Sequence, residues 1–286
     1  MNIALIGSRG LLGSALVDEL GPLHRLHVFD RPDVDLGDGS GLEAIIRLEP
    51  DALANCAGWT NKDTAERDTP QTVAELYRIN VDGAELAART AWRARALLVH
   101  VSDAEIFDGL KRSPYLPTDK PNPWSMYGSS KLEAENRVRM SAGRWVIVRS
   151  SAMFGPGRRG FVEDVIDTAR SGKPIRAISD QVTRPTYSRH LARAIGRVIS
   201  LPSLSAGRTL HVANRGQATW YEFAREIVRR TGIKSTIIPI TSEEAKQPAR
   251  RSRYSVLDLD EFESLARWKM PHWWDGLREH LGDRTP

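Results

Sequence analysis

Cysteine is nearly absent from this chain of 286 residues, and long apolar runs are absent altogether. Cys56 is the only cysteine, so no disulfide can form within the chain, and we expect a reducing, cytoplasmic location. No segment reaches about 20 consecutive apolar residues, the length of a membrane helix, and the strand-like start NIALIG is unlike a signal peptide. The seven histidines show no HxxxH or HxH spacing, which predicts no metal site.

Charge of neither sign dominates, because the chain has 41 Lys and Arg residues and 36 Asp and Glu residues, for a net charge of +5. A basic balance favours anionic partners, either a nucleic acid or a dinucleotide with a sugar nucleotide. The richest basic run is Arg250, Arg251 and Arg253, which is short and typical of a solvated or locally paired surface. We therefore expect no nucleic-acid partner and no membrane partner.

Short apolar runs alternate with helical patterns in the first half of the chain. The predicted strands are residues 3–6, 26–29, 52–57, 97–101 and 145–149, and the predicted helices include residues 70–89 and 127–140. Such alternation predicts an α/β fold with a Rossmann-type, doubly wound parallel sheet.

The pattern changes after Arg149, where FGPGRRG at residues 154–160 forms a predicted loop. We interpret residues 1–150 as one domain and residues 151–286 mainly as a smaller C-terminal α/β lobe. Residues 187–213 are expected to return to the first domain, with 209–213 adding a strand to its sheet. The segment 268–281 holds three tryptophans and is expected to close the second lobe.

A glycine-rich motif, GSRGLLG at residues 7–13, follows the first predicted strand and opens a helix. The backbone of a dinucleotide site must turn sharply, approach a pyrophosphate closely and present helix N–H groups to it. A Cβ atom would obstruct each step. The motif therefore predicts dinucleotide binding by Gly7, Gly10 and Gly13, with Leu11 and Leu12 between them. The alternative is a tight turn that needs glycine for positive φ.

The residues around the second strand give conflicting signals about the dinucleotide. Asp30 ends that strand, where an acidic residue usually holds the adenosine ribose hydroxyls, and this favours NAD(H). Arg9 and Arg31 flank the same place and could clamp a 2′-phosphate. We favour NADP(H) and leave NAD(H) open.

Tyr127 and Lys131 are four residues apart on a predicted helix, so they share one face. A neighbouring ammonium and an oxidised nicotinamide stabilise phenolate and lower the pKa of a tyrosine. Tyr127 could then protonate the oxygen of a carbonyl that receives hydride. The alternative is a surface aromatic beside a lysine.

Asn80 falls on the apolar stripe of the preceding predicted helix. A buried amide needs hydrogen-bond partners. It either satisfies local backbone or anchors a water molecule that leads towards the site.

Together these residues resemble the dTDP-4-dehydrorhamnose reductase family of extended short-chain dehydrogenases. The matching segments span nearly the whole chain: residues 7–13, 55–60, 63–66, 79–80, 106–109, 122–135, 149–155, 180–181, 185–186, 214, 216, 220–223, 249–251 and 255–258. The resemblance implies a cofactor-binding Rossmann lobe, a C-terminal lobe for a dTDP-linked sugar nucleotide and, as one possible assembly, a homodimer. It implies Tyr127 as proton donor, Lys131 as its partner and Asn80 in the proton relay. It places Cys56, Ala57, Gly58, Tyr127 and Lys131 at the cofactor.

Three positions depart from the family pattern. Asp103 replaces the threonine that hydrogen-bonds the keto oxygen, Ala152 replaces a tryptophan, and Arg184 replaces a glycine. The last two changes concern the identity of the sugar.

An ionised Asp103 could not donate to a keto oxygen, and it would raise the pKa of Tyr127. Ser102 could rotate in as the donor, Asp103 could stay protonated, or the site could be impaired. A fourth possibility is that Asp103 turns away and caps the next turn. We expect impairment or acid dependence rather than an ordinary neutral-pH reductase.

Two functions follow from this pattern. The first is an NAD(P)H-dependent reductase of a nucleotide-linked 4-keto-6-deoxysugar, with catalytic residues Tyr127, Lys131, Asn80, Asp103 and Ser102. The alternative is a catalytically impaired, cofactor-binding homologue that acts as a regulatory or interaction subunit.

Overall fold

Six parallel strands form the central sheet of the computed structural model, which describes residues 1–66 and 69–282. They are β1 (Asn2–Ile6), β2 (Arg25–Phe29), β3 (Ala52–Asn55), β4 (Leu97–Asp103), β5 (Trp145–Ser150) and β10 (Arg208–His211). Their order is β10-β5-β4-β3-β1-β2, so the chain reverses direction across the sheet after β2. Ligands of such sheets bind beyond the carboxyl ends of the strands, at the reversal. The prediction of a Rossmann-type parallel sheet is confirmed.

Alternate residues of each strand face opposite sides of the sheet, and both sides are apolar. In β1, Ile3 and Leu5 belong to one core, whereas Ala4 and Ile6 belong to the other. This two-residue period gives strands that are buried on both faces, as in other parallel sheets.

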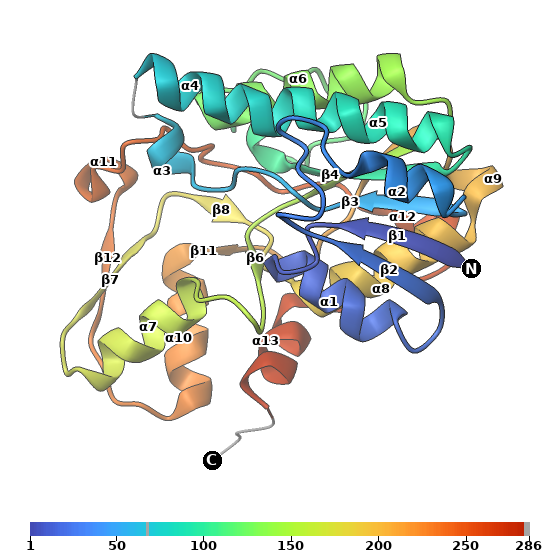
Figure 1. Ribbon diagram of the computed structural model, residues 1–286. Coiled ribbons are helices and arrows are strands. Elements are labelled where there is room, and N and C mark those ends of the chain that lie inside the picture. Colours follow the sequence, from blue (N-terminus) through green and yellow to red (C-terminus); the bar gives the residue numbers. More distant parts are fainter. Residues whose placement is uncertain (67–68, 283–286) are drawn as a thin grey trace.

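Helices cover both faces of the sheet (Figure 1). One face carries α1 (Leu11–Leu20), α8 (Ser188–Ser200) and α12 (Asp260–Ala266), with the short α9 (Pro202–Ser205) following α8. The other face carries α2 (Leu42–Arg47), α5 (Gly83–Arg93) and α6 (Met126–Ser141). The sequence pattern did not indicate α12, whose Phe262 lies in the core beside α8.

The predicted helix at 70–89 is longer than expected and is not uniform. It consists of α4 (Pro70–Tyr77), a π-helical turn (Arg78–Asp82) and α5. Thr69 caps its start by accepting a hydrogen bond from Thr72 N. Asn80 lies inside the π-helical turn, a feature that is frequent at functional sites.

Most of the remaining elements pack around a separate aromatic core that includes Phe154, Phe223 and Trp273. The helices here are α7 (Phe161–Arg170), α10 (Trp220–Thr231), α11 (Ser242–Ala245) and α13 (Trp273–Leu281). Three strand pairs accompany them: β6 (Met153–Phe154) with β9 (Thr186–Tyr187), β7 (Ile175–Ile178) with β12 (Ile237–Ile240), and β8 (Val182–Thr183) with β11 (Ala218–Thr219).

The predicted strand at 209–213 corresponds to β10, which pairs in parallel with β5. The division into residues 1–150 and 151–286 stays a prediction, and its last four residues, 283–286, lie outside the described residues. No helix among residues 1–66 and 69–282 is long and apolar enough to cross a membrane.

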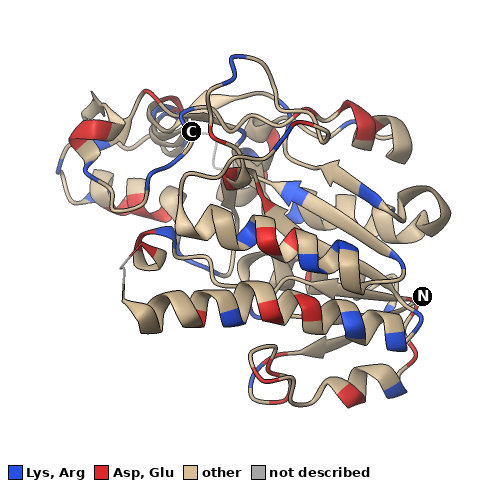
Figure 2. Ribbon diagram, turned by 90° about the horizontal axis from the view of Figure 1, so that it is seen from above, with Lys and Arg blue, Asp and Glu red and all other residues tan. Residues whose placement is uncertain are grey.

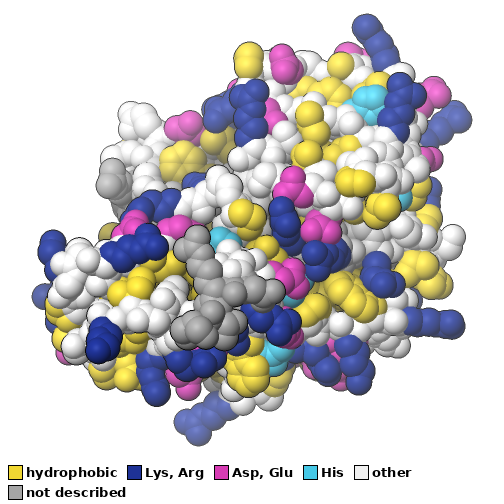
Figure 3. Space-filling model, turned by 90° about the horizontal axis from the view of Figure 1, so that it is seen from below, with side chains coloured by type: hydrophobic (Ala, Val, Ile, Leu, Met, Phe, Trp, Pro, Cys, Tyr) yellow, Lys and Arg dark blue, Asp and Glu magenta, His cyan; other side chains and the backbone are white. Residues whose placement is uncertain are grey.

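Charges of both signs are interspersed along the helices that cover the sheet (Figure 2). On the face seen in Figure 3, Lys and Arg side chains are likewise scattered among acidic and hydrophobic ones. The net positive charge is therefore not gathered into one basic patch on these faces.

Candidate active site

A cavity of about 720 Å³ lies beyond the carboxyl ends of β1, β2, β3 and β4. The sheet side of its wall includes Gly7, Gly10, Asp30 and Ala57, and the other side includes Phe154, Arg158, Val182 and Trp220. It therefore lies where the strand order predicts a ligand site.

The glycine motif closes one end of this cavity. Gly7 has φ +87, and a Cβ there would lie 2.7 Å from Ala57 N. A Cβ on Gly13 would overlap the carbonyl of Gly7. Gly7 and Gly13 therefore stand where only glycine fits, whereas a Cβ on Gly10 would lie 3.3 Å from Gly7 O. Leu11, Leu12, Cys56 and Gly58 also line the cavity. This arrangement fits a dinucleotide pyrophosphate at the start of α1.

Asp30 is already engaged by the glycine loop. Its carboxylate accepts hydrogen bonds from the Ser8 hydroxyl and, at 3.2 Å, from Arg9 N. The Arg9 guanidinium lies 4.0 Å from the same carboxylate, and its side chain is 78% exposed. Arg31 lines the cavity beside Asp30. Both predicted arginines therefore flank the end of β2, where the two cofactors differ.

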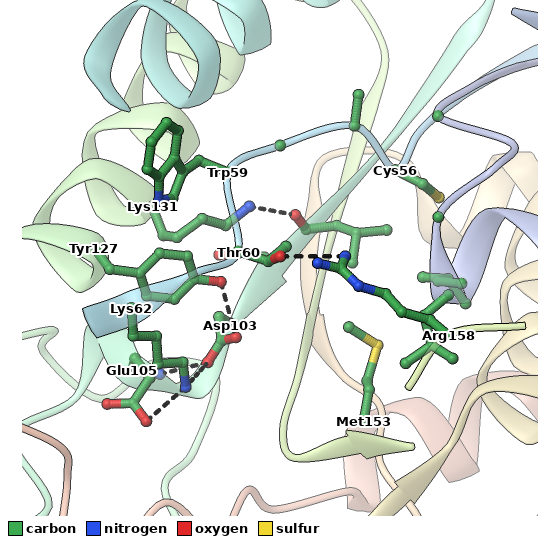
Figure 4. A pocket seen from close by; sticks show the side chains of 18 of the residues that line it. Cys56, Trp59, Thr60, Lys62, Asp103, Glu105, Tyr127, Lys131, Met153 and Arg158 are labelled. Atoms are coloured by element: carbon green, nitrogen blue, oxygen red, sulfur yellow. Dashed lines mark hydrogen bonds and ion pairs between the residues drawn. The ribbon is translucent and has the colours of Figure 1, made fainter. Parts of the chain in front are cut away.

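Tyr127 and Lys131 face the cavity from α6, as their spacing predicted (Figure 4). Ser125 begins this helix by accepting a hydrogen bond from Gly128 N. Lys131 Nζ donates to Val101 O at 2.7 Å, and burial lowers the pKa of its ammonium. Both side chains are buried, which rules out the alternative of a surface pair.

Tyr127 Oη donates to Asp103 Oδ2 at 3.0 Å. Burial and the charge of Asp103 raise the pKa of Tyr127 well above its ordinary value. The direction is the one that the sequence led us to expect from Asp103. A raised pKa keeps the proton on Oη at neutral pH, so the phenol is in its proton-donating form.

Asp103 both caps a turn and faces the cavity, two possibilities that the sequence left separate. Its Oδ1 accepts from Glu105 N at 3.0 Å, which begins the 3-10 turn Ala104–Ile106, while its Oδ2 meets Tyr127. The carboxylate does not turn away.

Ser102 does not take the donor position that was one option from the sequence. Its hydroxyl donates to Glu135 Oε1 at 2.7 Å, inside a buried network that includes Arg149. Ser102 lines the cavity together with Asp103, but its hydroxyl is directed at Glu135 here. A rotation of Ser102 into the donor position stays a prediction.

Asn80 connects two segments of the site. Its amide oxygen accepts from Trp59 N at 2.7 Å, and its Nδ2 donates to Ser130 Oγ at 2.9 Å. Ser130 in turn donates to Tyr127 O at 2.8 Å. The amide oxygen thus hydrogen-bonds a backbone N–H group, which agrees with one of the two interpretations of Asn80. The side chain also ties the loop after β3 to the helix of Tyr127.

Eight further charged residues line the cavity and were not predicted as site residues: Asp35, Lys62, Glu75, Glu105, Arg158, Arg159, Glu163 and Arg251. Lys62 begins α3 (Lys62–Ala65), and its Nζ lies 2.8 Å from Glu105 Oε1 and 3.9 Å from Asp103 Oδ1. Arg251 pairs with Asp63 at 3.0 Å, so the basic run 250–253 is locally paired there. For Glu105 a signal was available, because it lies two residues after the end of β4.

Of the other departures from the family pattern, only Ala152 lines the cavity, where its φ is +41. Arg184 donates to Leu257 O and Gly216 O and is absent from the cavity wall among the described residues. Arg184 therefore does not contact a ligand in this cavity. Instead it links its own segment to those of Leu257 and Gly216.

The Cys56 thiol is not prepared for nucleophilic chemistry, because burial raises its pKa to about 12. Within residues 1–66 and 69–282, no group of three or more His, Cys, Asp or Glu is arranged to hold a metal ion. The chemistry available here is therefore that of Tyr127, the two lysines and the carboxylates.

Comparison with known proteins places this geometry in a family. The curated relative "Spore coat polysaccharide biosynthesis protein SpsK" of Bacillus subtilis is 34% identical over 237 residues, covering 83% of this chain and 81% of the relative. The dTDP-4-dehydrorhamnose reductase of Escherichia coli is 30% identical over 298 residues, covering 99% and 98%.

A solved dTDP-4-dehydrorhamnose reductase from Bacillus anthracis, in complex with NADP, superposes with a TM-score of 0.90 at 28% identity, covering 98% of each chain. The family model described as "RmlD substrate binding domain" matches residues 1–285. On this match, which spans the glycine loop, the Tyr127 helix and the C-terminal elements alike, the chain belongs to the RmlD substrate binding domain family.

Proposed function

We propose that the protein reduces the 4-keto group of a dTDP-linked 6-deoxysugar with NADP(H), as an enzyme of deoxysugar biosynthesis. The observation that carries the proposal is that the glycine loop, Tyr127 and Lys131 all line one and the same cavity. In this proposal residues 1–150, with 187–213, bind the cofactor, and the remainder binds mainly the sugar nucleotide.

The cofactor would supply hydride to the carbonyl carbon. Tyr127 holds its proton on Oη at the cavity, ready for the carbonyl oxygen. Lys131 is fixed by Val101 O, so its charge stays beside the tyrosine helix. Asn80 and Ser130 hold that helix against the loop after β3. These residues position a proton donor at the wall of the cavity.

The activity is tested by mixing the purified protein with NADPH and a dTDP-4-keto-6-deoxysugar. We expect loss of NADPH absorbance that depends on the sugar and yields a 4-hydroxy product by mass spectrometry. No oxidation over a wide pH range, with the ligands shown to bind, would contradict the proposal.

The choice of cofactor gives a second expectation. Replacing Arg9 and Arg31 together by Ala should weaken NADPH binding much more than NADH binding, because both guanidinium groups flank the end of β2. Loss of charge-assisted contacts of this kind costs about 1.5–3 kcal/mol, or roughly tenfold to a hundredfold in affinity. Fluorescence titration with each nucleotide measures this, and equal losses for both would contradict the assignment to NADP(H).

The alternative of a regulatory or interaction subunit is not favoured, since the curated relatives include several named reductases. The homodimer suggested by the family resemblance belongs to the proposal as well. Light scattering on the purified chain tests it, and a monomer at micromolar concentration would exclude it.

A further inference from the structure

Three charged side chains from different segments meet beside Tyr127. Lys62 comes from α3, Asp103 from the end of β4, and Glu105 from the turn that follows. Lys62 Nζ is 2.8 Å from Glu105 Oε1, 3.9 Å from Asp103 Oδ1 and 5.4 Å from the centre of the Tyr127 ring. Figure 4 shows Lys62 below the tyrosine and Lys131 above it, with Asp103 at the hydroxyl.

Asp103 alone would oppose ketone reduction. Hydride addition places negative charge on the carbonyl oxygen, and proton transfer from Tyr127 Oη then leaves a phenolate 3.0 Å from a carboxylate. Both steps increase negative charge next to Asp103, so an uncompensated carboxylate would disfavour them.

We infer that Lys62 is a positioning residue for this reaction: held by Glu105, its ammonium neutralises Asp103 and so allows Tyr127 to act at neutral pH. The inference rests on the proposed function. In the balanced reaction NADPH would be oxidised as its nicotinamide C–H bond breaks, the carbonyl π bond would open as the new C–H bond forms, and the resulting alkoxide would take the proton from the O–H bond of Tyr127. The phenolate would then regain a proton from solvent.

The other charged groups facing Asp103 do not replace Lys62. Lys131 approaches from α6 and feels the charge of Asp103, but its ammonium donates to Val101 O and makes no salt bridge with Asp103 among the described residues. Glu105 is itself negative and is balanced by Lys62. Arg251 lies on the loop beyond Lys62 and is paired with Asp63. Lys62 is thus the cation that salt-bridges Asp103 among the described residues. Burial lowers the pKa of Lys62, but the charges of Asp103 and Glu105 outweigh this and raise it, so its ammonium stays charged.

The decisive experiment compares pH profiles of kcat for four proteins: the parent, Lys62→Met, Lys62→Arg and Lys62→Met combined with Asp103→Thr. We expect Lys62→Met to lose at least about tenfold at neutral pH and to recover as the pH falls, because only protonated Asp103 is then tolerated; tenfold corresponds to one pKa unit. Lys62→Arg should keep the parent profile. The double variant should regain a flat profile, because no carboxylate remains to be neutralised.

A matched control is Arg251→Met, which removes one positive charge from the same cavity but leaves Asp103 paired. Its pH profile should keep the parent shape even if its KM changes. The inference is overturned if Lys62→Met keeps the parent profile, or if its loss is equally large in the Asp103→Thr background.

A second measurement does not depend on turnover. In ¹³C-carboxyl NMR titrations, Asp103 should take up its proton at a higher pH in Lys62→Met than in the parent. An unchanged titration would overturn the pairing whether or not the sugar is reduced. A parent that shows this shift but never oxidises NADPH would contradict the proposed function and leave the pairing intact.

Discussion

Replacement of Tyr127 by Phe is expected to lower kcat by about 10²- to 10⁴-fold, the usual cost of losing a positioned general acid. The substitution removes only the hydroxyl that meets Asp103, while the ring stays packed against Ala65 and Leu76. NADPH affinity should therefore stay close to that of the parent. Steady-state kinetics with a dTDP-4-keto-6-deoxysugar and a separate fluorescence titration measure the two quantities.

A suitable control is Tyr115→Phe. The Tyr115 hydroxyl donates to Asp108 at 2.7 Å, and Tyr115 does not line the cavity. Its loss should leave kcat within a few-fold of the parent. Activity of Tyr127→Phe in the same range would show that another group donates the proton.

The largest loss of stability is expected from Arg149→Met. Glu135 is fully buried, and its two oxygens accept from Arg149 at 2.9 and 2.8 Å. Removing the guanidinium leaves a buried carboxylate without its main partner, which costs about 3–5 kcal/mol. Urea unfolding at neutral pH measures the free energy directly. Arg139→Met is the matched control: it also contacts Glu135, but its side chain is 32% exposed, so a loss below about 1 kcal/mol is expected.

The same pair determines a pH dependence. Burial would raise the pKa of Glu135, but the hydrogen bonds and charge of Arg149 outweigh it and hold the pKa at about 2. Because the folded value lies below the unfolded value of about 4.3, the stabilisation is complete above that pH and is lost as the pH falls towards 2. Arg149→Met should therefore lose less stability than the parent over this interval. Equal acid sensitivity of the two proteins would contradict this account.

Local spacing in the sequence was sufficient for much of the fold. Apolar runs located the first five strands of the sheet within a few residues, and the segment 209–213 overlaps β10. The three strand pairs outside the sheet were not predicted, because most of their strands have only two residues and carry no periodicity. The π-helical turn was also missed, since one additional residue hardly alters an apolar stripe.

The same limit applies to the site. Gly7–Gly13 and Tyr127–Lys131 are predictable because each set lies within a few residues of sequence, the glycines at one strand-to-helix junction and the Tyr–Lys pair on one helix. Lys62 and Glu105 are 43 residues apart, and their contact depends on where a loop after β3 meets the end of β4. Without that contact, Asp103 looked like an unbalanced charge, and impairment or acid dependence was the natural expectation.

The π-helical turn at Arg78–Asp82 takes up about one residue more per turn than an α-helix, so α4 and α5 keep their phase on either side of it. Asn80 lies inside this turn, and Leu76 lies just before it, buried beside Ala65 and Tyr127. Deleting one residue of the turn would therefore leave the packing of Leu76 in place but would remove the bulge that carries Asn80. The irregular turn thus separates the residue that supports the tyrosine ring from the amide that ties its helix to the loop after β3.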